Sequence, residues 1–371
     1  MSRPKPHLAP YPAAPRVNRR AAVSMGAALL AALAPLAQSA AQTAAASVAA
    51  PALPPAPAPE SYTAETTWAK LAKTYPFIRI ASRTVPATVR AVEDITYVRR
   101  ETHALQLDLY LPAAKAGERA PAPAIVLVHG GGWRAGLRSN LAPLAIRLAE
   151  RGYAAATIGY RLSPEAAYPA AVLDAKAAVR WLRAHGQSYG IDGARIAIGG
   201  ASAGGQVASL AGVTADREIV EPAAAVDAAD AATAPGKVSS AVQAIVNIDG
   251  LSDFTDPEAL RYEDDPAKQP SLAGAWFGGR YAQKEALWRE ASPTFHVTRD
   301  TPPILFIGSA QPRFSIGREA MIGKMAALGI PSRVVMVPDT PHSFWLFDPW
   351  LAPTVEATAA FLDKYLRGAG R

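Results

Sequence analysis

The chain contains 371 residues, half of them hydrophobic, and it has no cysteine. This length allows a substantial core, and the composition excludes disulfide bonds and cysteine-ligated metal sites. The formal net charge is +7, but residues 1–41 supply five of these charges. The remaining chain has a net charge near +2, and its basic residues are scattered. This distribution argues against a nucleic-acid partner.

Residues 1–41 have the pattern of a secretory signal peptide. A basic stretch at 16–20 precedes an apolar run at 21–36, and small residues follow at 37–41. The adjacent Arg19 and Arg20 are a feature of twin-arginine signals. Pro35 ends the apolar run at signal-peptide length, which argues against a membrane anchor. We therefore expect an exported protein, periplasmic or extracellular, without a stable membrane anchor after cleavage.

An alanine- and proline-rich linker is expected next, over residues 42–60. We expect one folded domain to occupy residues 61–371. It opens with a mixed segment, 61–90, in which a short helix around Trp68 could form a flap or partial cap.

Strand and helix patterns then alternate along the chain. Two segments in which polar and apolar residues alternate predict an antiparallel hairpin of edge strands, 94–99 and 105–111. Continuous apolar runs predict buried strands at 124–129, 153–160, 195–199, 242–248, 304–308 and 333–337. Helical patterns occur at 140–151, 169–188, after 206, at 315–328 and at 354–366. Two stretches are expected to be excursions from the core, an alanine-rich one at 216–240 and a long irregular one at 250–298. The alternation predicts an α/β fold with a mostly parallel central sheet and helices on both faces.

One glycine-rich turn carries a serine between a predicted strand and a predicted helix. It reads Gly199-Gly-Ala-Ser202-Ala-Gly-Gly205. The pattern Gly-x-Ser-x-Gly in this context indicates a nucleophile elbow, where small neighbours allow a strained turn to lift the serine. The pentapeptide alone would also fit a phosphate-binding turn.

A second glycine run, His129-Gly-Gly-Gly-Trp133, directly follows a buried strand upstream of the elbow. Acyl transfer needs backbone N–H groups about 3 Å from the developing oxyanion, and glycines let bare backbone approach a substrate. We therefore predict that Gly131, Gly132 and Ala203 form an oxyanion hole. The two motifs together favour a hydrolase over a mobile glycine loop.

These motifs, together with Tyr160-Arg-Leu-x-Pro-Glu165, resemble α/β-hydrolases of the hormone-sensitive-lipase-like and carbohydrate-esterase-like branches. The resemblance covers about residues 90–368. It implies an α/β-hydrolase catalytic domain and a serine esterase whose triad follows the order serine, acid, histidine. We expect no metal or other cofactor, since the chain lacks a His-Glu-x-x-His motif and any close histidine pair.

The chain has six histidines, and the catalytic one can be predicted by eliminating the other five. Five are in unsuitable places: His7 in the signal peptide, His103 between the first strands, His129 before the glycines, His185 ending a helix and His296 before a strand. His342 remains, in a loop after the last predicted strand. A general base must reach Ser202 from the carboxyl end of a strand, so we predict His342 as the base.

The triad acid is less clearly defined. The resemblance implies an aspartate near residues 309–312, where this chain has Gln311, and glutamine cannot stabilise an imidazolium by charge. We favour Asp249, which directly ends the preceding strand. Asp253 and Glu319 stay open as alternatives, while Asp339 is expected only to shape a turn.

The substrate prediction rests on the aromatic residues after His342. Phe344, Trp345, Phe347 and Trp350 could stack on a sugar or wall a small acyl pocket, and they could equally pack beneath the terminal helix. The run 343–347 resembles exported esterases that deacetylate plant polysaccharides. We therefore expect an acyl-enzyme on Ser202 and a small-molecule ester or acylated carbohydrate as substrate. A general short-chain carboxylesterase or lipase is the alternative, as is an inactive hydrolase fold that serves as a binding protein.

Overall fold

The computed structural model describes residues 59–100, 104–113, 120–163, 165–217, 237–268 and 270–368. All of them belong to one compact unit of the chain. The expected signal peptide and all but the last two residues of the expected linker lie outside this range. Those two residues already belong to a 3₁₀ turn, η1 (Pro59–Ser61), so the described fold begins just before the expected domain boundary.

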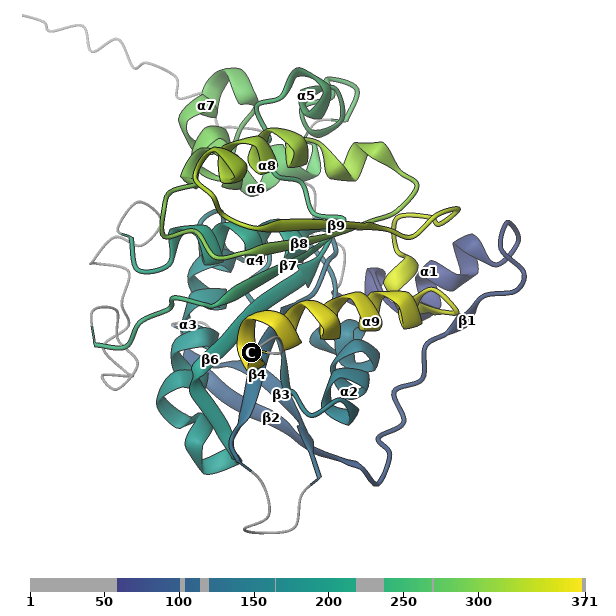
Figure 1. The fold of residues 1–371 in the computed structure, drawn as a ribbon. Helices are drawn as coiled ribbons and strands as arrows, with labels where there is room; N and C mark the ends of the chain where they lie inside the picture. The colour runs from purple at the N-terminus through teal and green to yellow at the C-terminus, as the bar shows by residue number, and fades with distance from the viewer. Residues whose placement is uncertain are drawn as a thin grey trace, which may run out of the picture. The chain divides into compact units, whose positions relative to one another are not determined.

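Helices and strands alternate over most of the described chain (Figure 1). The strands are β1 (Arg79–Ile80), β2 (Val89–Arg99), β3 (Ala104–Pro112), β4 (Ala122–Val128), β5 (Ala154–Ile158), β6 (Ile191–Ala201), β7 (Ala244–Ile248), β8 (Ile304–Gly308), β9 (Ser332–Met336) and β10 (Phe347–Asp348). The α-helices are α1 (Ala64–Leu71), α2 (Ala142–Glu150), α3 (Ala170–His185), α4 (Ala203–Thr214), α5 (Pro257–Glu263), α6 (Leu272–Phe277), α7 (Tyr281–Glu290), α8 (Arg318–Ala327) and α9 (Leu351–Leu362). Further short turns are η2 (Arg138–Leu141), η3 (Gly186–Tyr189), η7 (Pro293–His296), η8 (Pro312–Ser315), η9 (Phe344–Leu346) and the π-helical η10 (Asp363–Arg367). 

Eight strands form the central sheet in the order β2-β3-β5-β4-β6-β7-β8-β9. The pairs β2–β3 and β3–β5 are antiparallel, and all later neighbours are parallel. The predicted mostly parallel sheet is therefore confirmed. In such a sheet the carboxyl ends of the parallel strands share one edge, and there the strand that precedes Ser202 lies between β4 and β7.

The predicted hairpin is correct, but only β2 is an edge strand. The second strand, β3, pairs with β5 on its other side, with Leu107 opposite Ile158. Its alternating pattern contains a buried carboxylate, Asp108, which accepts hydrogen bonds from Arg138 and the backbone of Asp94. Because these partners satisfy Asp108, a polar residue can occupy an interior strand.

Helices cover both faces of the sheet, as predicted. Side chains of β4 alternate between two cores: Val126 and Val128 belong to one with residues of α3, α4 and α8, whereas Ile125 and Leu127 belong to the other with residues of α2 and α9. The period of two along a strand produces this division. Both faces are buried, which explains the continuous apolar run at this segment.

The stretch 250–298 is not irregular as expected, because it folds into three short helices, α5, α6 and α7. The side chains of Asp256 and Ser271 cap α5 and α6. Trp276 and Trp288 are fully buried, and Trp276 stacks on Trp133 with ring centroids 4.7 Å apart. The helices are too short to show a clear period, so the pattern of the sequence did not reveal them.

The segment before β2 is attached to the loop that carries His342. Strand β1 pairs with β10, which places Ile80 opposite Phe347, and Ala81 donates a backbone hydrogen bond to Leu346. The helix expected around Trp68 is present as α1. No helix among the described residues is long and apolar enough to span a membrane.

Candidate active site

Ser202 lies on the sharp turn between β6 and α4, with φ 55° and ψ −124°. Its backbone N–H donates to Ile248, which ties the turn to β7. A Cβ at Gly200 would lie 2.2 Å from the carbonyl oxygen of Gly204, and one at Gly204 would lie 2.0 Å from that of Val128. Only glycine therefore permits this close approach of strand, turn and helix, and the strained turn exposes the serine hydroxyl.

His342 lies in the loop after β9, with its Nε2 2.7 Å from Ser202 Oγ. Its Nδ1 is 2.9 Å from a carboxylate oxygen of Asp249. A carboxylate can only accept, so Nδ1 carries the proton and Nε2 accepts from the serine hydroxyl. This tautomer is the one that a general base for Ser202 requires.

Asp249 directly follows β7 and is 4% exposed. One carboxylate oxygen accepts from His342 and the other accepts from the backbone N–H of Ser309, at 2.8 Å. The loop after β8, in which the resemblance implied an acid, thus supports Asp249 through its backbone. The structure brings Ser202, His342 and Asp249 together in a linear chain of hydrogen bonds.

The alternative carboxylates lie elsewhere. Asp253 accepts from the backbone and hydroxyl of Thr255, which is a turn interaction. Glu319 has a side chain that is 74% exposed and paired with Arg318. Neither residue forms a hydrogen bond or ion pair with His342 among the described contacts.

The glycine run after β4 forms a turn beside the elbow. Gly131, Gly132 and Trp133 all have positive φ, of 125°, 61° and 58°. Gly131, Gly132 and Ala203 line the same cavity as Ser202 and His342. The predicted oxyanion donors therefore surround the space in front of the serine, where a substrate carbonyl would lie.

His129 is buried and supports this turn. Tyr160 stacks on its ring and donates a hydrogen bond to its carbonyl oxygen. Burial lowers the pKa of His129 to about 4, so the ring is neutral. His296 bonds to a backbone carbonyl and is also structural, while His7 and His103 lie outside the described residues.

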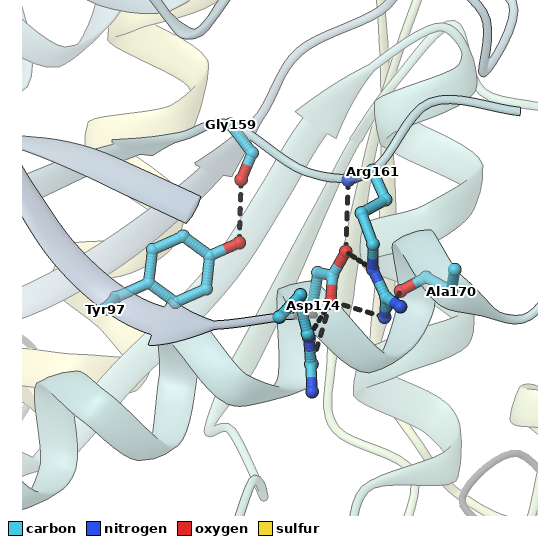
Figure 2. Close-up of polar contacts among 6 residues, drawn as sticks. Tyr97, Gly159, Arg161, Ala170 and Asp174 are labelled. Atoms are coloured by element: carbon cyan, nitrogen blue, oxygen red, sulfur yellow. Dashed lines mark hydrogen bonds and ion pairs between the residues drawn. The ribbon is translucent and has the colours of Figure 1, made fainter. Parts of the chain in front are cut away.

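The segment after β5 is held by a buried ion pair (Figure 2). Arg161 makes two side-chain contacts and one backbone contact with Asp174, which is fully buried on α3 and also binds Arg100. Two positions further on, the backbone of Ser163 donates to the carbonyl of Trp133 at 2.7 Å. The Tyr-Arg motif thus connects α3 to the glycine turn.

A cavity of about 390 Å³ opens onto Ser202. The lining residues that were not singled out from the sequence include Tyr62, Glu263, Leu272, Arg313 and Phe314. The hydroxyl of Tyr62 bonds to Ser343, next to His342, and burial raises the pKa of this tyrosine to about 12. The predicted flap within 61–90 was a sequence signal for Tyr62, and the other four had none.

The aromatic run after His342 packs under the terminal helix and does not line the cavity. Phe344, Trp345 and Phe347 are at most 1% exposed, and they share a core with residues of α9. Trp345 also lies next to His342, with the two rings nearly perpendicular and their centroids 5.1 Å apart. The proposed stacking of a sugar on this run is therefore wrong, because the rings are already covered.

The part of the chain that the structure describes contains no cluster of three histidine, aspartate or glutamate side chains that could hold a metal ion. The site is built from a serine, an imidazole, a carboxylate and backbone amides. These groups suffice for covalent acyl transfer.

The activity should fall on the acid side with a midpoint below pH 6.5. Burial lowers the pKa of His342 from 6.5, and the hydrogen bond to Asp249 opposes this shift only in part. A base must be neutral, so protonation below its pKa removes activity. A profile of kcat/KM against pH for a neutral ester should show this limb and a plateau at pH 7; a midpoint above 6.5 would contradict the assignment.

The sheet order, the nucleophile elbow and the serine–histidine–aspartate contacts define an α/β-hydrolase. The BD-FAE family model matches residues 107–314, more than half of the chain, and the chain therefore belongs to that family. The matched region contains Ser202, Asp249 and the glycine turn.

Individual relatives carry esterase names. Esterase LipC of Mycobacterium tuberculosis is 33% identical over 263 residues, covering 67% of this chain and 59% of that protein. An ethyl acetate hydrolase of Pseudomonas putida is 34% identical over 134 residues, covering 35% of this chain and 42% of that protein. A solved structure titled as a bifunctional GH43-CE of Bacteroides eggerthii has a TM-score of 0.60 and 26% identity, covering 74% of this chain and 38% of that one. The chain spans about half the length of the curated relatives it matches.

Proposed function

We propose that this protein hydrolyses carboxylic esters through an acyl-enzyme on Ser202. The observation that carries the proposal is the pair of hydrogen bonds from Ser202 to His342 and from His342 to Asp249. The esterase names of its relatives support the same reaction class. An inactive fold was considered because the acid expected near Gln311 is missing; in this proposal Asp249, at the end of the preceding strand β7, takes that role.

The proposed reaction follows from this geometry. Ser202 attacks the ester carbonyl while His342 removes its proton, and Asp249 stabilises the resulting imidazolium. The amides of Gly131, Gly132 and Ala203 stabilise the oxyanion. His342 then protonates the departing alcohol. In the second half, His342 takes a proton from the water that attacks the acyl-enzyme and returns it to Ser202 Oγ as the carboxylic acid leaves.

Short acyl groups, including acetyl groups on plant polysaccharides, are the proposed substrates. Leu272 lies over the glycine turn, since a Cβ at Gly132 would be 2.7 Å from its Cδ1. The cavity is small, and this side chain limits the length of chain that can lie beside the oxyanion site. The ethyl acetate hydrolase relative and the GH43-CE neighbour support a small acyl group and a carbohydrate alcohol, respectively.

The preference for short chains should be measurable with p-nitrophenyl esters. We expect kcat/KM to fall at least about tenfold from butyrate to octanoate, and Leu272→Ala to recover much of this loss because truncation opens the pocket. Val334→Ala, at an exposed position on β9, is the matched control and should leave the profile unchanged. Acetate release from acetylated xylan or pectin tests the carbohydrate part. A preference for octanoate with no polysaccharide deacetylation would contradict this substrate class.

We also propose that the protein is exported and acts outside the cytoplasm without a lasting membrane anchor. The support is the basic, apolar and small-residue pattern of residues 1–41. N-terminal sequencing of protein recovered from the periplasm or medium tests this: a start near residue 42 supports export, and an intact residue 1 opposes it.

A further inference from the structure

A column of side chains runs from α5 to the imidazole of His342. Phe314 lies nearly parallel to His342, with ring centroids 3.3 Å apart and an interplanar angle of 10°. The guanidinium of Arg313 lies over the rings of both Phe314 and Tyr262, at 5.1 and 4.8 Å. Trp345 meets His342 edge-on. The imidazole is therefore held by Phe314 against its face and by a core tryptophan.

An ion pair fastens this column to α5. Arg313 Nη2 is 3.0 Å from Glu263, whose side chain is only 12% exposed. The Nε of Arg313 is buried and has no hydrogen-bond partner. The ion pair therefore links α5 to η8, the turn that carries Phe314.

We infer that Glu263 and Arg313 act as positioning residues, which hold Phe314 against His342 and so keep Nε2 directed at Ser202. The inference rests on the proposed function. The loop after β8, which would carry the acid by family resemblance, here supplies an aromatic ring to the base instead. Asp249 fixes His342 through Nδ1, and Phe314 restrains its rotation from the ring face.

The charges of Glu263 and Arg313 should have a measurable effect on the pKa of His342. Three charged groups act on His342 from different elements: Asp249 at the end of β7, Glu263 on α5 and Arg313 on η8. Lys70 and Arg134 also line the cavity. Glu263 favours the imidazolium and raises the pKa of His342, whereas Arg313 lowers this pKa. Removing one partner must therefore shift the acid limb in the direction opposite to that caused by removing the other.

The ring contact is tested with Phe314→Leu and Phe314→Tyr. Leucine keeps the apolar bulk but loses the flat face, so kcat for p-nitrophenyl acetate should fall about tenfold or more, while KM changes less. Tyrosine restores the face and should restore kcat. Equal activity in both variants, or a loss confined to KM, would overturn the positioning role of the ring.

The ion pair is tested with Glu263→Gln, Arg313→Gln and the double variant, using the pH profile of kcat/KM. We expect the acid limb to move to lower pH in Glu263→Gln, to higher pH in Arg313→Gln, and to lie between them in the double variant. Glu319→Gln removes a surface carboxylate and is the matched control, which should follow the wild type. Shifts in the same direction, or a wild-type kcat for p-nitrophenyl acetate in both single variants, would overturn the inference.

The activity of the wild type distinguishes a failure of the proposed function from a failure of the positioning role. If the wild type hydrolyses p-nitrophenyl acetate and Ser202→Ala does not, the proposed function stands, and the variants of the column then decide the inference. If the wild type is inactive, the proposed function fails, and this inference fails with it. Circular dichroism of each variant tests whether its fold is retained.

Discussion

Ser202→Ala should lower kcat for p-nitrophenyl acetate by about 10⁶-fold. The substitution removes the nucleophile and leaves His342 without the proton that it accepts. The variant should still hydrolyse the ester slightly faster than water alone, because the amides around the cavity still bind the substrate carbonyl. Steady-state release of p-nitrophenol measures the effect.

The fold of this variant should be unchanged. Alanine keeps the Cβ of serine and adds no atom to the turn, and the backbone bond from residue 202 to Ile248 is retained. Ser188→Ala, at an exposed serine on η3, is the control and should keep full activity. Wild-type activity in Ser202→Ala would refute covalent catalysis at this residue.

Asp249→Asn should lower kcat by about 10⁴-fold. The carboxylate accepts from His342 on one oxygen and from Ser309 on the other. An asparagine that still accepts from Ser309 turns its NH₂ toward Nδ1, which favours protonation at Nε2 and so blocks acceptance of the serine proton. The loss of charge also removes the stabilisation of the imidazolium.

Two matched substitutions make this experiment specific. Glu319→Gln and Asp253→Asn replace the other candidate acids, and we expect each to stay within about threefold of the wild type because neither contacts His342. If Asp249→Asn were fully active and Glu319→Gln or Asp253→Asn were impaired by orders of magnitude, the acid would have to be reassigned.

The central residues of the site could be predicted because each is tied to a local pattern. Ser202 belongs to a strand–turn–helix motif, and the glycine run follows a continuous apolar strand. The parallel sheet then brings the ends of β4, β6 and β7 to one edge, so Asp249 was a sound choice as the residue that ends its strand. His342 could be predicted as the base because the other histidines lie in places from which a base would not reach Ser202.

The walls of the cavity could not be predicted in the same way. Glu263 and Arg313 are 50 positions apart, and the segments that bring them together are short helices and turns without a readable period. Tyr62 reaches the site through contacts with distant segments, since its hydroxyl bonds to Ser343 and its carbonyl accepts from Asn140. The aromatic run after His342 was ambiguous, since core packing and sugar stacking favour the same residue types.

The proposed reaction depends most directly on the formation of an acyl-enzyme at Ser202. Rapid mixing of the wild type with p-nitrophenyl acetate, followed by acid quench and peptide mass spectrometry, measures this intermediate. We expect one acetyl group on the peptide that contains Ser202, formed in the wild type and absent from Ser202→Ala. An acetyl group on another residue that turns over at the catalytic rate, or hydrolysis that does not depend on Ser202, would contradict covalent catalysis by Ser202.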